Sequence, residues 1–142
     1  MKPLIKNVLA IIAGWLSGSV INMVLIQVGH YLIPIEGVDP NDMEALMAVM
    51  PTLDAEYFLF PFLAHALGAL IGAAIAGLIA ATHKMKISLC IGVLFLIGGI
   101  VVNYMVGGPT WFVVLDIVVA YIPMAWFGWK LSKISIKKNR LN

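Results

Sequence analysis

Ionisable side chains stand inside two long apolar stretches of this 142-residue chain. Asp116 is the most informative of them, because a carboxylate at the centre of a membrane-crossing helix costs about 2.5–3.5 kcal/mol on insertion scales. Such a group must be protonated or paired, and His65 lies at the matching depth of its own apolar stretch. An acid and an imidazole in hydrocarbon predict a site that takes up a proton or a small cation.

Four further polar side chains extend this pattern: Asn103, Asn22, His30 and Gln27. At about 1.5 Å per residue, all of them fall in the same half of the membrane as Asp116 and His65. Polar groups that face lipid stay unsatisfied, so we expect these six side chains to converge inside the protein. Asp116 is then the titrating acid and His65 its partner, while Asn103 and Asn22 orient the ligand.

A structural interpretation of the same residues stays open. Buried Asp–His and Asp–Asn hydrogen bonds also join helices without any function, at about 0.6 kcal/mol each. His30 and Gln27 equally fit positions that only face the membrane interface. Both interpretations predict contact between the polar groups, and only the functional one predicts a ligand.

Composition places these residues in an all-α integral membrane protein. The chain is 62% hydrophobic and 11% charged, against roughly 25% charged in an ordinary soluble domain. One domain over residues 1–142 is expected, a bundle of four transmembrane helices in the lipid bilayer. The expected segments are helices at about 4–33, 58–82, 87–106 and 110–131, a loop at 34–57 and a basic tail at 132–142.

The charges predict how the helices are oriented. Lysine and arginine occur only near the N-terminus, at residues 84–86 and from residue 130 to the C-terminus. All but one of the seven acidic residues lie between residues 36 and 56. Short basic loops stay in the cytoplasm, so both termini are expected inside a cell inner membrane and the acidic loop outside.

Two local signals refine this bundle. Asp39 and Pro40 are typical of a helix start, and a methionine-rich stripe from Met43 to Met50 follows at helical spacing. They predict a short amphipathic helix that lies on the outer surface, with its stripe inward. Pro123 predicts a kink in the fourth span.

Small residues recur every fourth position in the first two spans: Gly14 and Gly18, then Gly68, Gly72 and Ala76. Such rows let helices approach closely. They predict helix packing within the chain or between copies. Because a bundle of this size encloses little volume, we expect a homo-oligomer or a larger membrane complex, formed through a small-residue face of span one or two.

Other chemistry has little support in the sequence. There is no phosphate-binding loop, no CxxC, no HExxH and no nucleophile elbow, and the single Cys90 excludes an internal disulfide. We therefore expect no cofactor, no metal, no nucleic acid and no enzyme. The leading hypothesis is an inner-membrane protein that binds or passes a small cation, proton or small solute through an outward-facing polar pocket. The alternatives are an accessory or assembly subunit and, third, an enzyme acting on a lipid.

Overall fold

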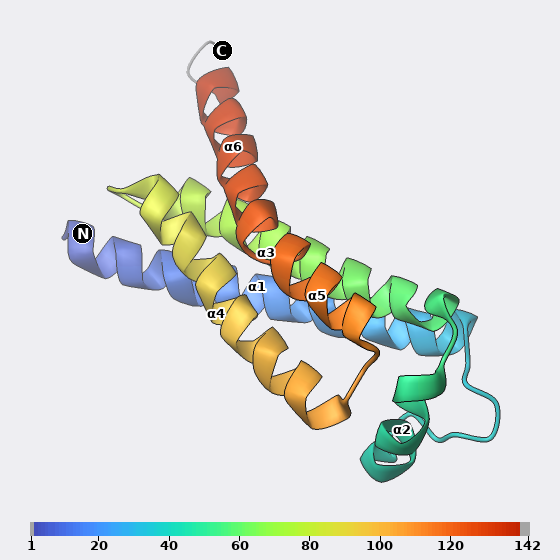
Figure 1. The fold of residues 1–142 in the computed structure, drawn as a ribbon. Helices are drawn as coiled ribbons and strands as arrows, with labels where there is room; N and C mark the ends of the chain where they lie inside the picture. The colour runs from blue at the N-terminus through green and yellow to red at the C-terminus, as the bar shows by residue number, and fades with distance from the viewer. Residues whose placement is uncertain (1, 140–142) are drawn as a thin grey trace.

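A computed structural model describes residues 2–139, with side chains up to residue 137, and within these residues the chain is helical and has no strand. Figure 1 shows the arrangement of the helices. They are α1 (Pro3–Leu32), α2 (Met43–Val49), α3 (Leu59–Ile79), α4 (Lys84–Val106), α5 (Thr110–Val119) and α6 (Ile122–Asn139). Two short 3₁₀ turns, Met50–Thr52 and Ala55–Phe58, connect α2 to α3.

Four helical stretches are long and apolar enough to cross a membrane: Pro3–Leu32, Ala55–Ile79, Lys84–Val106 and Thr110–Lys137. The shortest has 23 residues, which is roughly 35 Å of helix against about 30 Å of hydrocarbon. The expected all-α fold is confirmed, and four of its helical stretches are apolar enough to span a membrane.

The ends of the spans differ from those expected. The second span ends at Ile79 and α4 begins at Lys84. The Lys84 ammonium reaches back to the carbonyl oxygens at the end of α3, among them Gly77 at 2.9 Å. The segment expected as a tail continues α6 as far as Asn139. It contains no glycine or proline after Ser132, so nothing in the backbone stops the helix.

The most extensive helix contact joins α1 to α3, which lie side by side (Figure 1). An added Cβ at Gly14 would stand 2.6 Å from the carbonyl oxygen of Gly72, and one at Gly18 only 2.5 Å from that of Gly68. Only glycine allows such backbone contact. We call these four glycines the glycine seam.

The other small residues of α3 are also covered within the chain. Ala73 and Ala76 are fully buried and form a core with Ile91 of α4 and Ala125 of α6. The Ser88 hydroxyl of α4 donates to the carbonyl oxygen of Ala73 at 2.8 Å. The small-residue rows therefore serve packing between α1, α3, α4 and α6, and are not free for a second copy.

The fourth span is broken in its middle. α5 ends at Val119, α6 begins at Ile122, and Ala120 and Tyr121 form a turn between them. Pro123 has no N–H to give to the carbonyl of Val119, so the helix cannot continue through this point. The expected kink is thus present as a break.

The prediction that the loop helix starts at Pro40 was wrong. α2 starts at Met43, and the Asp42 carboxylate caps it by accepting from the Ala45 N–H at 3.0 Å. Asp39 instead accepts from the Asn41 N–H at 2.8 Å in a preceding turn. Of the methionine-rich stripe, Leu46 is buried, whereas Met43 and Met47 are exposed.

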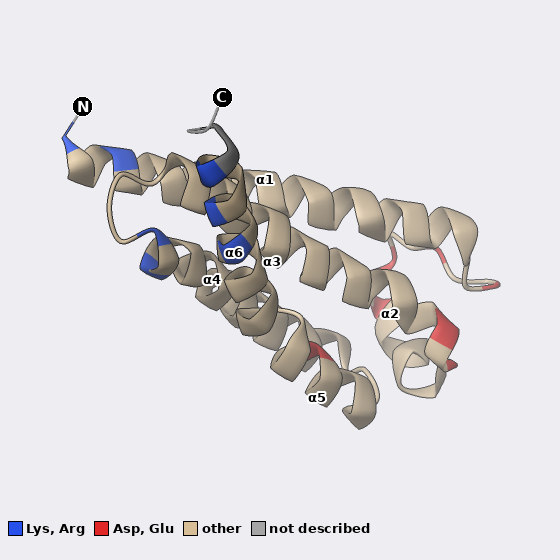
Figure 2. Ribbon diagram, turned by 90° about the horizontal axis from the view of Figure 1, so that it is seen from above, with Lys and Arg blue, Asp and Glu red and all other residues tan. Residues whose placement is uncertain are grey.

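Charge separates the two ends of the bundle, as Figure 2 shows. We call the end with the N-terminus, the α3–α4 turn and the last turns of α6 the basic end. The end with α2 and its flanking loop is the acidic end.

Candidate functional site

A buried carboxylate links three helical segments of the bundle and the turn before α6. Asp116 of α5 has no exposed surface, and its Oδ1 and Oδ2 lie 2.8 and 3.0 Å from the Nδ1 of His65 on α3. Oδ2 also accepts from the Asn103 amide of α4 at 3.0 Å and from the Tyr121 hydroxyl at 2.6 Å. We call these four residues the carboxylate cluster.

The Asp116 carboxylate is the common acceptor of the cluster. Its oxygens accept hydrogen bonds, and each of its three neighbours has an N–H or O–H to donate. In this arrangement His65 carries its proton on Nδ1, so its Nε2 holds a lone pair.

The break in the fourth span brings Tyr121 to the carboxylate. On an unbroken helix, two residues five positions apart point about 140° away from each other. The turn at Ala120–Tyr121 changes this direction, so the hydroxyl reaches Asp116. Gly99 of α4 makes room for the hydroxyl, because a Cβ there would collide with it.

The second ring nitrogen of His65 is turned toward open space. The side chain is 14% exposed, and Nε2 has no hydrogen-bond partner among the described residues. No buried side-chain nitrogen or oxygen of the described residues lacks a partner, so Nε2 is not buried. The imidazole therefore presents a free nitrogen to a cavity.

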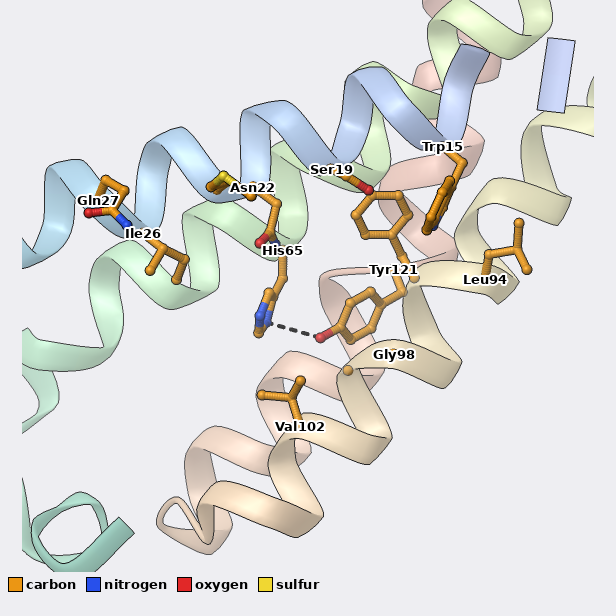
Figure 3. A pocket seen from close by; sticks show the side chains of 13 residues that line it. Trp15, Ser19, Asn22, Ile26, Gln27, His65, Leu94, Gly98, Val102 and Tyr121 are labelled. Atoms are coloured by element: carbon orange, nitrogen blue, oxygen red, sulfur yellow. Dashed lines mark hydrogen bonds between the residues drawn. The ribbon is translucent and has the colours of Figure 1, made fainter. Parts of the chain in front are cut away.

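Two cavities meet at His65. The larger, of about 450 Å³, lies between α1, α3 and α4 and includes Trp15, Ser19 and Asn22 in its wall (Figure 3). The smaller, of about 320 Å³, lies toward the acidic end under α2, where Met43 and other α2 side chains line it. Four residues line both cavities: Ile26, Gln27, His65 and Val102.

The other predicted residues lie on the cavity walls and outside the cluster. Asn22 lines the larger cavity, Gln27 lines both, and His30 lines the smaller one. Within the described residues, none of these three side chains makes a hydrogen bond. The structure thus joins Asp116, His65 and Asn103 directly, and the ligand roles of all six residues stay predictions.

Sequence reasoning missed Tyr121, which is 1% exposed and central to the cluster. One signal was available: tyrosines of membrane proteins gather at the interfaces, and this one lies in mid-span, two residues before Pro123. Trp15 and Ser19 of the cavity wall were missed too, and nothing in their spacing singled them out.

The cluster holds too few ligands for a metal centre of the usual kind. Within the described residues, no group of three or more His, Cys, Asp or Glu side chains is placed to hold a metal ion.

Four apolar helices around a buried polar cluster define the class, a multi-spanning membrane protein. Comparison of the chain with protein-family models, with curated proteins and with solved structures finds no match. The geometry of the cluster and its cavities is therefore the basis for proposing a function.

Proposed function

We propose that this protein binds or passes a proton, a small cation or a small solute through an intramembrane pocket that opens toward the acidic end. One observation carries the proposal: the fully buried Asp116 is paired with His65, which lines two cavities and keeps one ring nitrogen without a partner among the described residues. Asp116 supplies the negative charge, His65 exchanges the proton, and Asn103 holds the carboxylate.

Charge balance supports a positively charged ligand. Among the described residues, no lysine or arginine lines either cavity or contacts Asp116. With neutral His65 the cluster carries one uncompensated negative charge, and such a charge is costly in a low-dielectric interior. A proton on His65 or a cation beside it removes that cost.

The orientation follows from the charges at the two ends. We propose that the basic end faces the cytoplasm of a cell inner membrane, and that α2 lies on the outer surface. Two single-cysteine variants in a Cys90→Ser background test this orientation: Met47→Cys at the acidic end and Ser135→Cys at the basic end. A membrane-impermeant maleimide should label the first in intact cells and the second only after lysis. The reverse pattern contradicts the orientation.

An accessory or assembly subunit is the second candidate. The full hydrogen bonding of Asp116 favours it, because a satisfied cluster also serves to join α3, α4, α5 and α6. In that case a partner chain or a second copy binds a surface other than the glycine seam.

Proteoliposomes with an entrapped pH dye separate the two candidates. Potassium and valinomycin compensate the charge that moves. After a pH step, vesicles with wild-type protein should lose the pH gradient faster than empty vesicles. Adding sodium outside tests whether sodium ions exchange for protons. Asp116→Asn keeps the shape of the side chain and should abolish this flux, while circular dichroism shows unchanged helicity. Equal flux in both proteins, or none in either, favours the accessory subunit.

A further inference from the structure

The larger cavity has a polar end and an apolar end. Side chains that offer nitrogen or carbonyl oxygen acceptors lie from the middle of the cavity to one end: His65, Asn22 and Gln27. Apart from the Ser19 and Tyr121 hydroxyls, apolar and aromatic side chains line the rest, and Trp15 and Leu94 lie at the end opposite Gln27 (Figure 3). A ligand that fits this cavity has a polar head and an apolar body.

The polar end selects a positive head. The titratable groups that face His65 are Asp116 and Tyr121, with His30 on the wall of the smaller cavity. None of the described side chains facing it is a lysine or arginine. The Nε2 of His65 accepts a hydrogen bond only when the imidazole is neutral. A proton and a donor cation therefore compete for the same nitrogen.

The volume of the cavity indicates an organic cation. About 450 Å³ falls within the usual range of small-molecule sites, roughly 300–1,000 Å³, and far exceeds what a bare ion needs. A primary ammonium has three N–H donors for Nε2 and for the amide oxygens of Asn22 and Gln27. Aromatic side chains such as Trp15 and Phe95 suit an apolar or aromatic body.

The cavity also opens on the side that faces lipid. Trp15 and Met23 of α1 and Val102 of α4 line it and are exposed on the outside of the bundle. We infer that the larger cavity binds a lipophilic primary amine in its ammonium form, taken from the bilayer, in exchange for a proton on the Nε2 of His65. This inference rests on the proposed function and names its ligand class.

Titration calorimetry of the purified protein in maltoside micelles tests the exchange. The probe is phenethylammonium, and its uncharged isostere propylbenzene is the control ligand. Titrations in phosphate and in MOPS, two buffers with different protonation enthalpies, together give the number of protons released on binding. At low pH we expect about one proton released per amine bound. Affinity should rise with pH for as long as the primary amine keeps its charge, because the competing proton becomes scarcer. Propylbenzene should not bind.

Two variants locate the site. Asp116→Asn should weaken phenethylammonium binding at least about thirtyfold, because it removes the charge that the ammonium neutralises. Gly98→Leu should do the same by filling the cavity, since a Cβ at Gly98 meets nothing within 4 Å. Val101→Leu, on the exposed surface of the same helix and outside both cavities, is the matched control and should bind like wild type.

Each contrary outcome has a separate meaning. Binding of propylbenzene as tight as that of the amine, or amine binding unchanged in Asp116→Asn or Gly98→Leu, overturns the site. Amine binding without proton release contradicts the proposed exchange of amine for proton. If the amine does not bind but proton flux still depends on Asp116, the proposed ligand class is wrong and the proposed function stands. If there is neither amine binding nor Asp116-dependent proton flux, the proposed function is wrong as well.

Discussion

α1 has two unlike interfaces. Toward α3, the glycine seam brings backbone against backbone, with 2.6 Å between an added Cβ at Gly14 and the Gly72 oxygen. Toward α4, the same helix lines a cavity of about 450 Å³ through Trp15, Ser19 and Asn22. The two sides of α1 therefore have different roles. The glycine seam holds α1 against α3, the helix that carries His65, and the side toward α4 leaves a cavity in which a ligand fits.

A bulky residue in the glycine seam should lower the free energy of unfolding more than the other substitutions considered below. Gly18→Leu places side-chain atoms where the Gly68 carbonyl oxygen stands, and backbone cannot rotate away as a side chain can. We expect a loss of about 3 kcal/mol or more in the free energy of unfolding, at the upper end of overpacking effects. Denaturation by SDS in mixed micelles, followed by circular dichroism, measures it.

Gly98→Leu on the open side is the matched control for this change. Both substitutions put the same side chain on a helix, but a Cβ at Gly98 meets no atom within 4 Å. Its free energy of unfolding should stay within about 0.5 kcal/mol of wild type. Equal destabilisation by the two would mean that α1 does not pack more tightly on one side than on the other.

Removing the carboxylate should have the next largest effect. Asp116→Leu leaves the donors of His65, Asn103 and Tyr121 without their acceptor, and we expect about 2 kcal/mol of destabilisation. Asp116→Asn retains one acceptor oxygen and should cost less. The same SDS titration compares them, and a leucine variant as stable as the asparagine variant would show that water satisfies the freed donors.

Much of this arrangement was predictable from one-dimensional patterns. The four spans follow from the lengths of the apolar runs, and the contact of Asp116 with His65 follows from equal depth along two helices. The small-residue rows indicated close packing, but a four-residue spacing does not show which helix packs against such a row. The structure pairs Gly14 and Gly18 with α3 of the same chain.

Two features that the sequence did not predict depend on where a helix begins or ends. Tyr121 would point away from Asp116 on a straight helix, so its contact depends on the break that Pro123 causes two residues later. The start of α2 depended on a choice between two aspartates, and Asp42, not Asp39, supplies the cap. The cavities arise from the spacing of whole helices, which local patterns do not encode.

A smaller effect is expected where α4 supports the cluster. In Gly99→Ala the new methyl group displaces the Tyr121 hydroxyl from the carboxylate, whereas Gly98→Ala, one position earlier, meets open space. We expect Gly99→Ala to lose about 1 kcal/mol in the SDS titration and to weaken phenethylammonium binding. Tyr121→Phe removes only the hydroxyl, and unchanged binding in this variant would show that the hydroxyl does not tune Asp116.

The smallest effect is expected at the basic end of the seam, far from the open side. The Asn7 amide donates to the Thr82 hydroxyl at 2.9 Å, and its oxygen accepts from the Ala81 N–H at 2.9 Å. These bonds are exposed, so Asn7→Ala should cost about 0.5 kcal/mol in the SDS titration. Phenethylammonium affinity should not change, because the glycine seam lies on α1 at the level of the cavity residues Trp15 and Ser19 and holds the helix in place there without these bonds. A weaker affinity in Asn7→Ala would mean that the position of α1 at the cavity depends on its end as well as on the glycines.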